Sequence, residues 1–309
     1  MKNVLLVQPT PEQQIHIRKT FNEDENTRDQ ALDTIKNWLR KQPHLPDTWD
    51  EHRLLIFLKG CHFSLELCKK KLDMYFTVRT HIPEFFSHRD ITSPDLQKVL
   101  SIVDGAVLPG LTPDFARVSV CRASKQDFDT PNMADVIKVT FMIGDIRMGM
   151  EETGVAYDIY IVDVGFPLAK HFFNVNPLVF KKMFVCIQEA YPVIIKQIHI
   201  VNASSFIYTA INTIKPFLGE TLSKTIHVHM GVETLYDFVP KEILPEEYGG
   251  TAGKLVDFKR QWLKKLEESR AWFKQEESVK ADETKRVQQD INYNAVFGME
   301  GSFRKLSVD

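Results

Sequence analysis

The residues best suited to chemistry in this sequence are two histidines and an aspartate on strand-like segments. His227 and His229 alternate along one such segment and would share a face, as two ligands of a metal ion do. No third ligand stands within reach in the sequence, so we expect structural histidines here. Asp163 ends another segment, where α/β enzymes often place an acid, but neither a nucleophile nor a base accompanies it.

Sequence motifs for catalysis and for phosphate binding are absent. The chain contains no GxSxG, P-loop, GxGxxG or HExxH pattern. Its cysteines lack the CxxC or Cys/His spacing of a zinc site, and four in 309 residues are too few for a disulfide framework. We therefore expect no metal ion, no cofactor and no enzymatic activity, in a reducing compartment. The cysteines are Cys61, Cys68, Cys121 and Cys186.

Composition predicts a globular chain without a strong electric field. Apolar residues make up 43% and charged residues 26%, and 39 basic against 41 acidic residues leave a net charge of −2, so nucleic acid is not expected as a partner. The first seven residues lack the apolar run of a signal peptide. The longest segment without Asp, Glu, Lys or Arg, residues 197–214, is too polar to span a membrane. These features favour a cytoplasmic protein.

Residues 1–84 are predicted to form a small all-helical domain. Thr48 and Glu51 are spaced as a capping box, and the apolar run at residues 54–58 follows them directly. Ser64 is the expected N-cap of the next helix. Several amphipathic helices of this kind can share one core.

Beyond residue 84, strand-like and helix-length segments alternate. Such alternation predicts an α/β domain around a largely parallel sheet, over residues 85–252. A charged helix at 258–275 and a polar stretch form a third region, 253–309, and we expect the tail after Gln275 to dock on the globular body. The predicted strands are 116–122, 155–162, 197–201 and 225–228, and the predicted helices are 132–150, 177–190 and 204–218.

The segment at 203–218 has an unusual polarity. One face of the predicted helix is strongly apolar, whereas the other face is polar with hardly a charge. An ordinary core helix fits this pattern, and so does a lid that covers an apolar cavity and lies against lipid when it opens. Periodicity leaves both interpretations open. The apolar face comprises Phe206, Ile207, Ala210, Ile211, Ile214 and Phe217.

Six segments, in this order along the chain, resemble signatures of one family. They are Leu54–Ser64 (similar to LLRFLRARKFD), Ile161–Asp163 (a strand ending in an acid), Gln188–Pro192 (QDAYP), His199–Asn202 (HIIN), Ile214–Leu218 (VKPFL) and Leu244–Gly250 (LPxEYGG). Together they resemble the CRAL-TRIO lipid-binding family, and residues 298–306 resemble the tail of its insect members related to tocopherol carriers.

This resemblance implies an intracellular carrier that encloses one small hydrophobic molecule, of tocopherol, retinoid or carotenoid type, and moves it between membranes. It implies a mixed, largely parallel sheet that floors the pocket, a gating helix at 206–218, and an all-α N-terminal bundle. Matching positions to tocopherol-carrying members places on the pocket wall Ile137, Thr140, Gly144, Val162, Met183, Cys186, Ile187, Tyr191, Val193 and Ile198, and on the inward face of the lid Ala210, Ile214 and Leu218.

Polar specificity is expected from one wall strand. Asp158, Tyr160 and Val162 share a face of that strand, and the family register turns this face inward. We hypothesise that the Asp158 carboxylate and the Tyr160 phenol orient a hydroxyl or carbonyl of the ligand. In the alternative, Asp158 bonds Thr140 or a water and never meets the ligand.

The chain departs from the family at a basic cluster that grips a phosphoinositide headgroup in tocopherol- and retinaldehyde-binding relatives. Three of the four matching positions are uncharged, so weak headgroup binding is expected, with Lys224 as a displaced substitute. The turn after Asp163 also differs. The family has an acid-x-x-Gly motif there, whereas Gly165 follows Asp163 after a single intervening residue. The matching positions are Ile194, Lys196, Thr221 and Thr225.

Three other functions stay open at this point. A phospholipid exchange protein of the same fold would need polar groups that accept a whole headgroup. An interaction module would keep the fold without a cavity. An enzyme would need a nucleophile that the sequence does not reveal.

Overall fold

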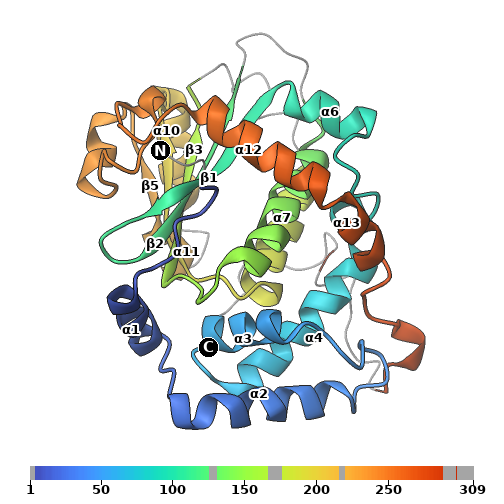
Figure 1. Ribbon diagram of the computed structural model, residues 1–309. Coiled ribbons are helices and arrows are strands. Elements are labelled where there is room, and N and C mark those ends of the chain that lie inside the picture. Colours follow the sequence, from blue (N-terminus) through green and yellow to red (C-terminus); the bar gives the residue numbers. More distant parts are fainter. Residues whose placement is uncertain (1–3, 125–130, 166–175, 216–219, 288–296, 298–309) are drawn as a thin grey trace.

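The computed structural model describes residues 4–124, 131–165, 176–215, 220–287 and 297. A five-stranded sheet lies at one end of the molecule and the N-terminal helices at the other, and helix α7 (Met133–Met150) runs between them (Figure 1). The strands lie in the order of the sequence: β1 (Val103–Leu111), β2 (Ala116–Ala123), β3 (Tyr157–Asp163), β4 (Ile195–Val201) and β5 (Ile226–Val228). Among these described strands, only β1 and β2 pair antiparallel. The predicted mixed, largely parallel α/β sheet behind an all-α N-terminal region is confirmed.

The N-terminal helices form around their own apolar core. Ser64 caps its helix as predicted, but the predicted capping box at Thr48 is wrong, because Asp50 accepts the hydrogen bond from the Arg53 amide. Asp50, two residues after Thr48, is therefore the N-cap, and its carboxylate accepts from the free backbone amides at the start of α3. The helices of this region are α1 (Pro11–Thr20), α2 (Glu25–Leu39), α3 (Glu51–Gly60) and α4 (Leu65–His81).

Strand β1 has no counterpart among the predicted elements. It contains Pro109 and two glycines, a composition that argues against a strand. The structure accommodates the proline because β1 is an edge strand whose register shifts between Val107 and Leu111. The Pro109 carbonyl still accepts a hydrogen bond from the Val7 amide at 2.9 Å.

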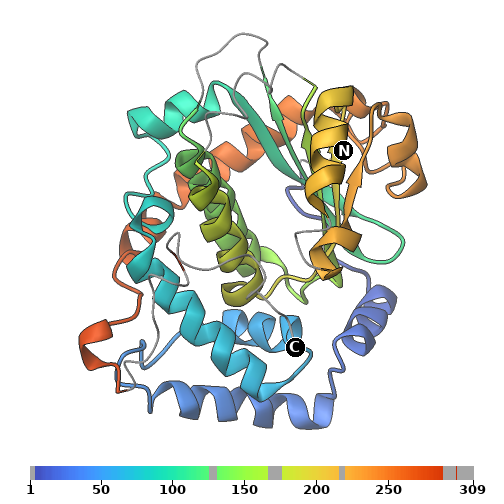
Figure 2. The ribbon, with the colours of Figure 1, turned by 180° about the vertical axis from the view of Figure 1, so that it is seen from behind.

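Further helices cover the sheet and join it to the bundle. The helix predicted at 258–275 is divided at Ser269, and residues 177–190 end in a π-helical turn. Seen from behind, α10 lies in front of the sheet (Figure 2). Among the described residues, no helix is both long and apolar enough to cross a membrane. These elements are α5 (Pro83–Phe86), α6 (Pro94–Leu100), α9 (Pro177–Val185), η1 (Cys186–Ala190), α10 (Ser205–Ile214), α11 (Glu220–Thr225), η3 (Glu233–Asp237), η4 (Glu246–Tyr248), α12 (Leu255–Glu268), α13 (Arg270–Glu276) and η5 (Glu283–Lys285).

A buried carboxylate joins α7 to the N-terminal helices. Asp145 accepts hydrogen bonds from Arg79 at 2.9 and 3.0 Å, from Arg89 at 2.7 Å and from the Tyr191 hydroxyl at 2.7 Å. Burial alone would raise the pKa of Asp145, but Arg79 and Arg89 hold it below its ordinary value. The carboxylate is therefore charged, and it ties two elements that lie far apart in the sequence.

A second tie comes from the C-terminal region. The segment 279–287, which we call the strap, runs along α4 and bonds to it through main chain and side chains. Arg286 reaches both oxygens of Asp73 at 2.9 and 3.1 Å and the Thr77 hydroxyl at 2.7 Å. The expected docking of the tail is confirmed for this segment and for Phe297, which is buried and stacks on His81.

The face of the sheet away from α7 carries three histidines. His199 is buried, and its Nδ1 lies 2.9 Å from Nε2 of His229, whose own Nδ1 lies 2.6 Å from the Thr234 hydroxyl. His227 stacks on His199, and Phe238 packs against all three rings. In the described parts of the chain, no three His, Cys, Asp or Glu side chains form a metal-binding group.

Prediction for the buried joint. Replacing Asp145 by Asn leaves two arginines without their anion, so the free energy of unfolding should fall by about 3–5 kcal/mol. Urea denaturation measures this loss. Asp90→Asn is the matched control, because the Asp90–Arg270 pair is solvent-exposed, and a much smaller loss is expected there. Equal losses in the two variants would contradict the importance of the joint.

Prediction for the histidine cluster. Burial lowers the pKa of His199 to about 3 and also lowers the pKa of His227 and His229; the nearby charges are Lys215 and Asp237. The folded cluster takes up protons at a lower pH than the histidines of the unfolded chain, which do so below about pH 6.5. Stability should therefore fall as the pH is lowered from about 7 towards 5.

Melting temperatures at several pH values test this expectation. His199→Asn removes one of the buried imidazoles, so its melting temperature should depend less on pH over this range, even if the variant is less stable at neutral pH. His52→Asn on α3, outside the cluster, should keep the wild-type pH dependence. An unchanged slope in His199→Asn would show that other groups control the acid response.

Candidate functional site

A cavity of about 110 Å³, here called the bundle cavity, lies between α7, strand β3, the η1 turn and helix α3. Its described wall is mostly apolar and includes aromatic, aliphatic and methionine side chains. The predicted wall residues that line it are Ile137, Thr140, Gly144, Asp158, Tyr160, Met183, Ile187, Tyr191 and Val193.

The N-terminal helices contribute to the bundle cavity, which the sequence reasoning missed. Ile56, Lys59 and Gly60 of α3 line it, together with Phe21. A Cβ atom at Gly60 would lie 2.2 Å from the Pro192 carbonyl oxygen, so only glycine permits this approach. Periodicity gives no signal for such a contact, because it depends on how two distant segments dock.

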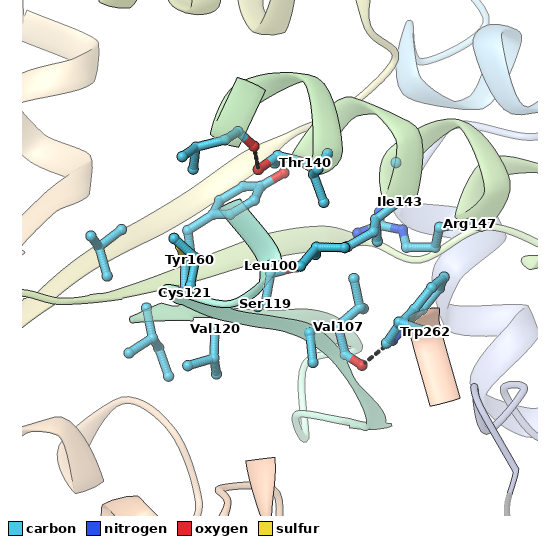
Figure 3. A pocket seen from close by; sticks show the side chains of 18 of the residues that line it. Leu100, Val107, Ser119, Val120, Cys121, Thr140, Ile143, Arg147, Tyr160 and Trp262 are labelled. Atoms are coloured by element: carbon cyan, nitrogen blue, oxygen red, sulfur yellow. Dashed lines mark hydrogen bonds between the residues drawn. The ribbon is translucent and has the colours of Figure 1, made fainter. Parts of the chain in front are cut away.

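A second cavity of about 120 Å³, here called the edge cavity, lies on the same face of the sheet beside β1, α6 and α12. Figure 3 shows Tyr160 next to Thr140 on one wall, with Trp262 on another. Trp262 is fixed by a hydrogen bond from its indole nitrogen to the Val107 carbonyl oxygen at 2.8 Å. Of the predicted wall residues, Thr140, Gly144, Tyr160 and Val162 line this cavity.

Arg147 of α7 is the main charged group at both cavities, and the sequence reasoning did not identify it. Its guanidinium donates to Asp158 Oδ1 at 2.5 Å, and its Nε lies 3.8 Å from Glu151 Oε1. Burial would lower the pKa of Arg147, but the two carboxylates raise it above its ordinary value. Asp158 is thus engaged by Arg147, and the alternative of a bond to Thr140 is wrong, since that hydroxyl donates to the Val136 carbonyl oxygen.

The carboxylates around Arg147 are themselves held in place. Arg117 is fully buried and donates two hydrogen bonds of 2.9 Å to Glu151. A third bond, of 3.0 Å, runs from Arg117 to the Val7 carbonyl oxygen. The four charged side chains therefore form one fixed network, and three of them, Arg147, Glu151 and Asp158, line the bundle cavity.

Tyr160 differs from its charged neighbours. Burial raises the pKa of its phenol well above the ordinary value, and the Asp158 charge adds to that effect, so the group is neutral. Among the described residues, none forms a hydrogen bond with its hydroxyl. This phenol is a neutral donor and acceptor that faces both cavities.

Helix α10, the predicted lid, packs on strands β4 and β5. Ile207 and Ile211 are buried there against Ile198 and the rest of a small apolar cluster, while Phe206 is 54% exposed. The described lining of the two cavities includes no residue of α10. Ala210 is half-buried. The side chain of Ile214 and residues Phe217 and Leu218 lie outside the described part of the structure.

The remaining predicted residues have other surroundings. Cys186 is buried in the core that the N-terminal helices share with η1, and it lines neither cavity. Val162 lines the edge cavity and is 37% exposed. Lys196 forms an ion pair with Asp114 and also lies 5.7 Å from the Tyr157 ring, and Lys224 is exposed on α11.

Comparisons with known proteins divide the chain into two matched regions. Residues 105–250 match the CRAL/TRIO domain family, and residues 24–96 match the family described as the Pinta-like UBA domain. The Mus musculus protein named Alpha-tocopherol transfer protein-like is 29% identical over 243 residues, which are 77% of this chain and 69% of that protein. Clavesin-2 of Rattus norvegicus is 23% identical over 243 residues, 78% of this chain and 74% of the relative. The solved structure of Sfh5 shares 14% identity, covers 81% of this chain and 96% of its own, and has a TM-score of 0.43.

Proposed function

The chain belongs to the CRAL-TRIO family, whose fold binds and transfers lipids, and from this membership we propose that it carries one small hydrophobic molecule of tocopherol, retinoid or carotenoid type between membranes. The name of the mouse relative, which refers to tocopherol transfer, supports this ligand class. We propose a carrier and not an enzyme, working in the cytoplasm with transient membrane contact.

The bundle cavity carries this proposal. It is enclosed by α7, the sheet and η1, and most of its described wall is apolar. Burying about 400–500 Å² of apolar ligand surface stabilises a complex by roughly 10–12 kcal/mol gross at ~25 cal/mol/Å². The translational and rotational entropy that the ligand loses offsets several kcal/mol of this gain, and the remainder is enough for a submicromolar dissociation constant.

Polar groups in the wall would select the ligand. We propose that the Tyr160 hydroxyl bonds a single hydroxyl or carbonyl group of the ligand, and that Asp158 acts on it mainly by fixing Arg147. A full phosphate headgroup is disfavoured, because Asp158 and Glu151 already offset the Arg147 charge. The two cavities also argue against an interaction module with a filled interior.

Helix α10 is proposed to move as a lid. Its buried face rests on β4 and β5, whereas Phe206 and Tyr208 are 54% and 40% exposed and available to lipid. Displacement from the sheet would uncover Ile198 and neighbouring apolar side chains. Phosphoinositide binding is proposed to be weak, because Asp114 offsets the charge of Lys196.

Prediction for the bound ligand. Mass spectrometry of the organic extract of protein purified under native conditions should identify a single class of hydrophobic molecule. Ile187→Trp places a bulky ring in the bundle cavity, and the extracted ligand should fall at least about tenfold, since the volume it needs is lost.

Leu67→Trp provides the control for size and apolarity. Leu67 lies on α4, is 39% exposed and lines neither cavity. The amount of ligand extracted from Leu67→Trp should therefore equal that extracted from the wild type. Full ligand content in Ile187→Trp would contradict the bundle cavity as the binding site. A phospholipid in the wild-type extract would favour the exchange protein instead.

Prediction for polar recognition. Tyr160→Phe removes only the hydroxyl, so affinity for a hydroxylated ligand such as retinol should fall by about 2- to 12-fold, the loss of one hydrogen bond. Affinity for the matching hydrocarbon should not change. Fluorescence titration of both molecules measures the difference. Equal changes for the two ligands would exclude a bond from this phenol.

A further inference from the structure

The two cavities are neighbours with a common partition. Four residues line both of them: Thr140, Gly144 and Arg147 of α7, and Tyr160 of β3. The three α7 residues stand about one turn apart on the helix face towards the sheet. Each cavity exceeds by roughly tenfold the ~10–15 Å³ that one water molecule requires, so each has room for part of an organic molecule.

The partition has one member that is held by ion pairs and one whose hydroxyl has no hydrogen bond to a described residue. Arg147 is held by Asp158 and Glu151. The Tyr160 hydroxyl forms no hydrogen bond with a described residue, so rotating its ring breaks none with them. At the same partition, Gly144 leaves space, because a Cβ added there would meet no heavy atom within 4 Å.

We propose that the bundle cavity and the edge cavity are two chambers of one pocket, and that the Tyr160 ring is the partition that a long ligand displaces beneath Gly144. The inference rests on the proposed carrier function and extends it to the shape of the ligand. A short molecule occupies one chamber, whereas an elongated one with an isoprenoid or polyene chain spans both.

Charge fixes the direction of such a ligand. The described lining of the edge cavity contains Arg147 as its sole charged residue, whereas the bundle cavity adds Lys59, Glu151 and Asp158. The polar end of the ligand therefore lies in the bundle cavity near Tyr160. Its hydrocarbon chain enters the edge cavity and ends near Trp262 and Leu263.

Chain-length dependence tests the proposal, with straight-chain 1-alkanols of about 6 to 16 carbons as probes. Each methylene buried should raise affinity by ~4-fold until the pocket is full. In the wild type the rise continues past the length that fills one chamber. Gly144→Leu blocks the passage, so its affinities should level off several carbons earlier than those of the wild type.

Leu67→Trp, at a position that lines neither cavity, is the control for an added bulky side chain, and the wild-type length dependence should persist in it. The same length dependence in Gly144→Leu and the wild type would overturn the two-chamber pocket. If the wild type binds no alkanol of any length, the proposed carrier function is contradicted. This outcome differs from the one that contradicts only the two-chamber pocket.

A second measurement leaves the partition unchanged and covers the case in which Gly144→Leu does not fold. Long alkanols with a terminal bromine should quench the fluorescence of Trp262 in the otherwise unaltered protein, and short ones should not. Trp262→Phe should abolish that quenching. Quenching that is absent for long chains, or that survives in Trp262→Phe, places the chain end elsewhere and overturns the proposal.

Discussion

The Asp145 carboxylate is the interaction on which the arrangement of this molecule depends. A charge buried this deeply is tolerated only because two arginines and a tyrosine surround it. These partners come from the N-terminal helices and from the segment after η1, so one ionic centre sets the position of α7 relative to both. Tyr191 also lines the bundle cavity, and the joint therefore fixes part of the cavity wall as well.

Helix α7 presents different chemistry on its two faces. Asp145 points to the N-terminal helices, whereas Arg147, two residues later, lies on the face towards the sheet and pairs with Asp158. Both faces bury a charge with a matched partner, which restricts the helix to one rotation about its axis. The thin partition at Gly144 and Tyr160 can exist only because the helix is held in this way, with a side chain missing where the two cavities meet.

Much of the fold follows from local patterns, and much of the site does not. Strands β2 to β5 were predictable from period-two apolar alternation, and the same period correctly puts Asp158 and Tyr160 on one face. Strand β1 could not be predicted in this way, because it contains a proline, which a strand accepts only at the edge of a sheet. Arg147 lies in an apolar stretch of α7 and has the sequence character of a solvent-facing charge; its role depends on a partner in another element. The approach of Gly60 to Pro192 is likewise a matter of docking between distant segments.

The strap has a consequence for the order in which the protein matures. Arg286 holds Asp73 across 213 positions of sequence, so the clamp cannot close until the ribosome has passed residue 286. Helix α4 must wait, with part of its surface uncovered, for a segment that is synthesised much later. The strap therefore docks after the groups of the Asp145 joint have been made, and until then the nascent chain exposes the surface that the strap will cover.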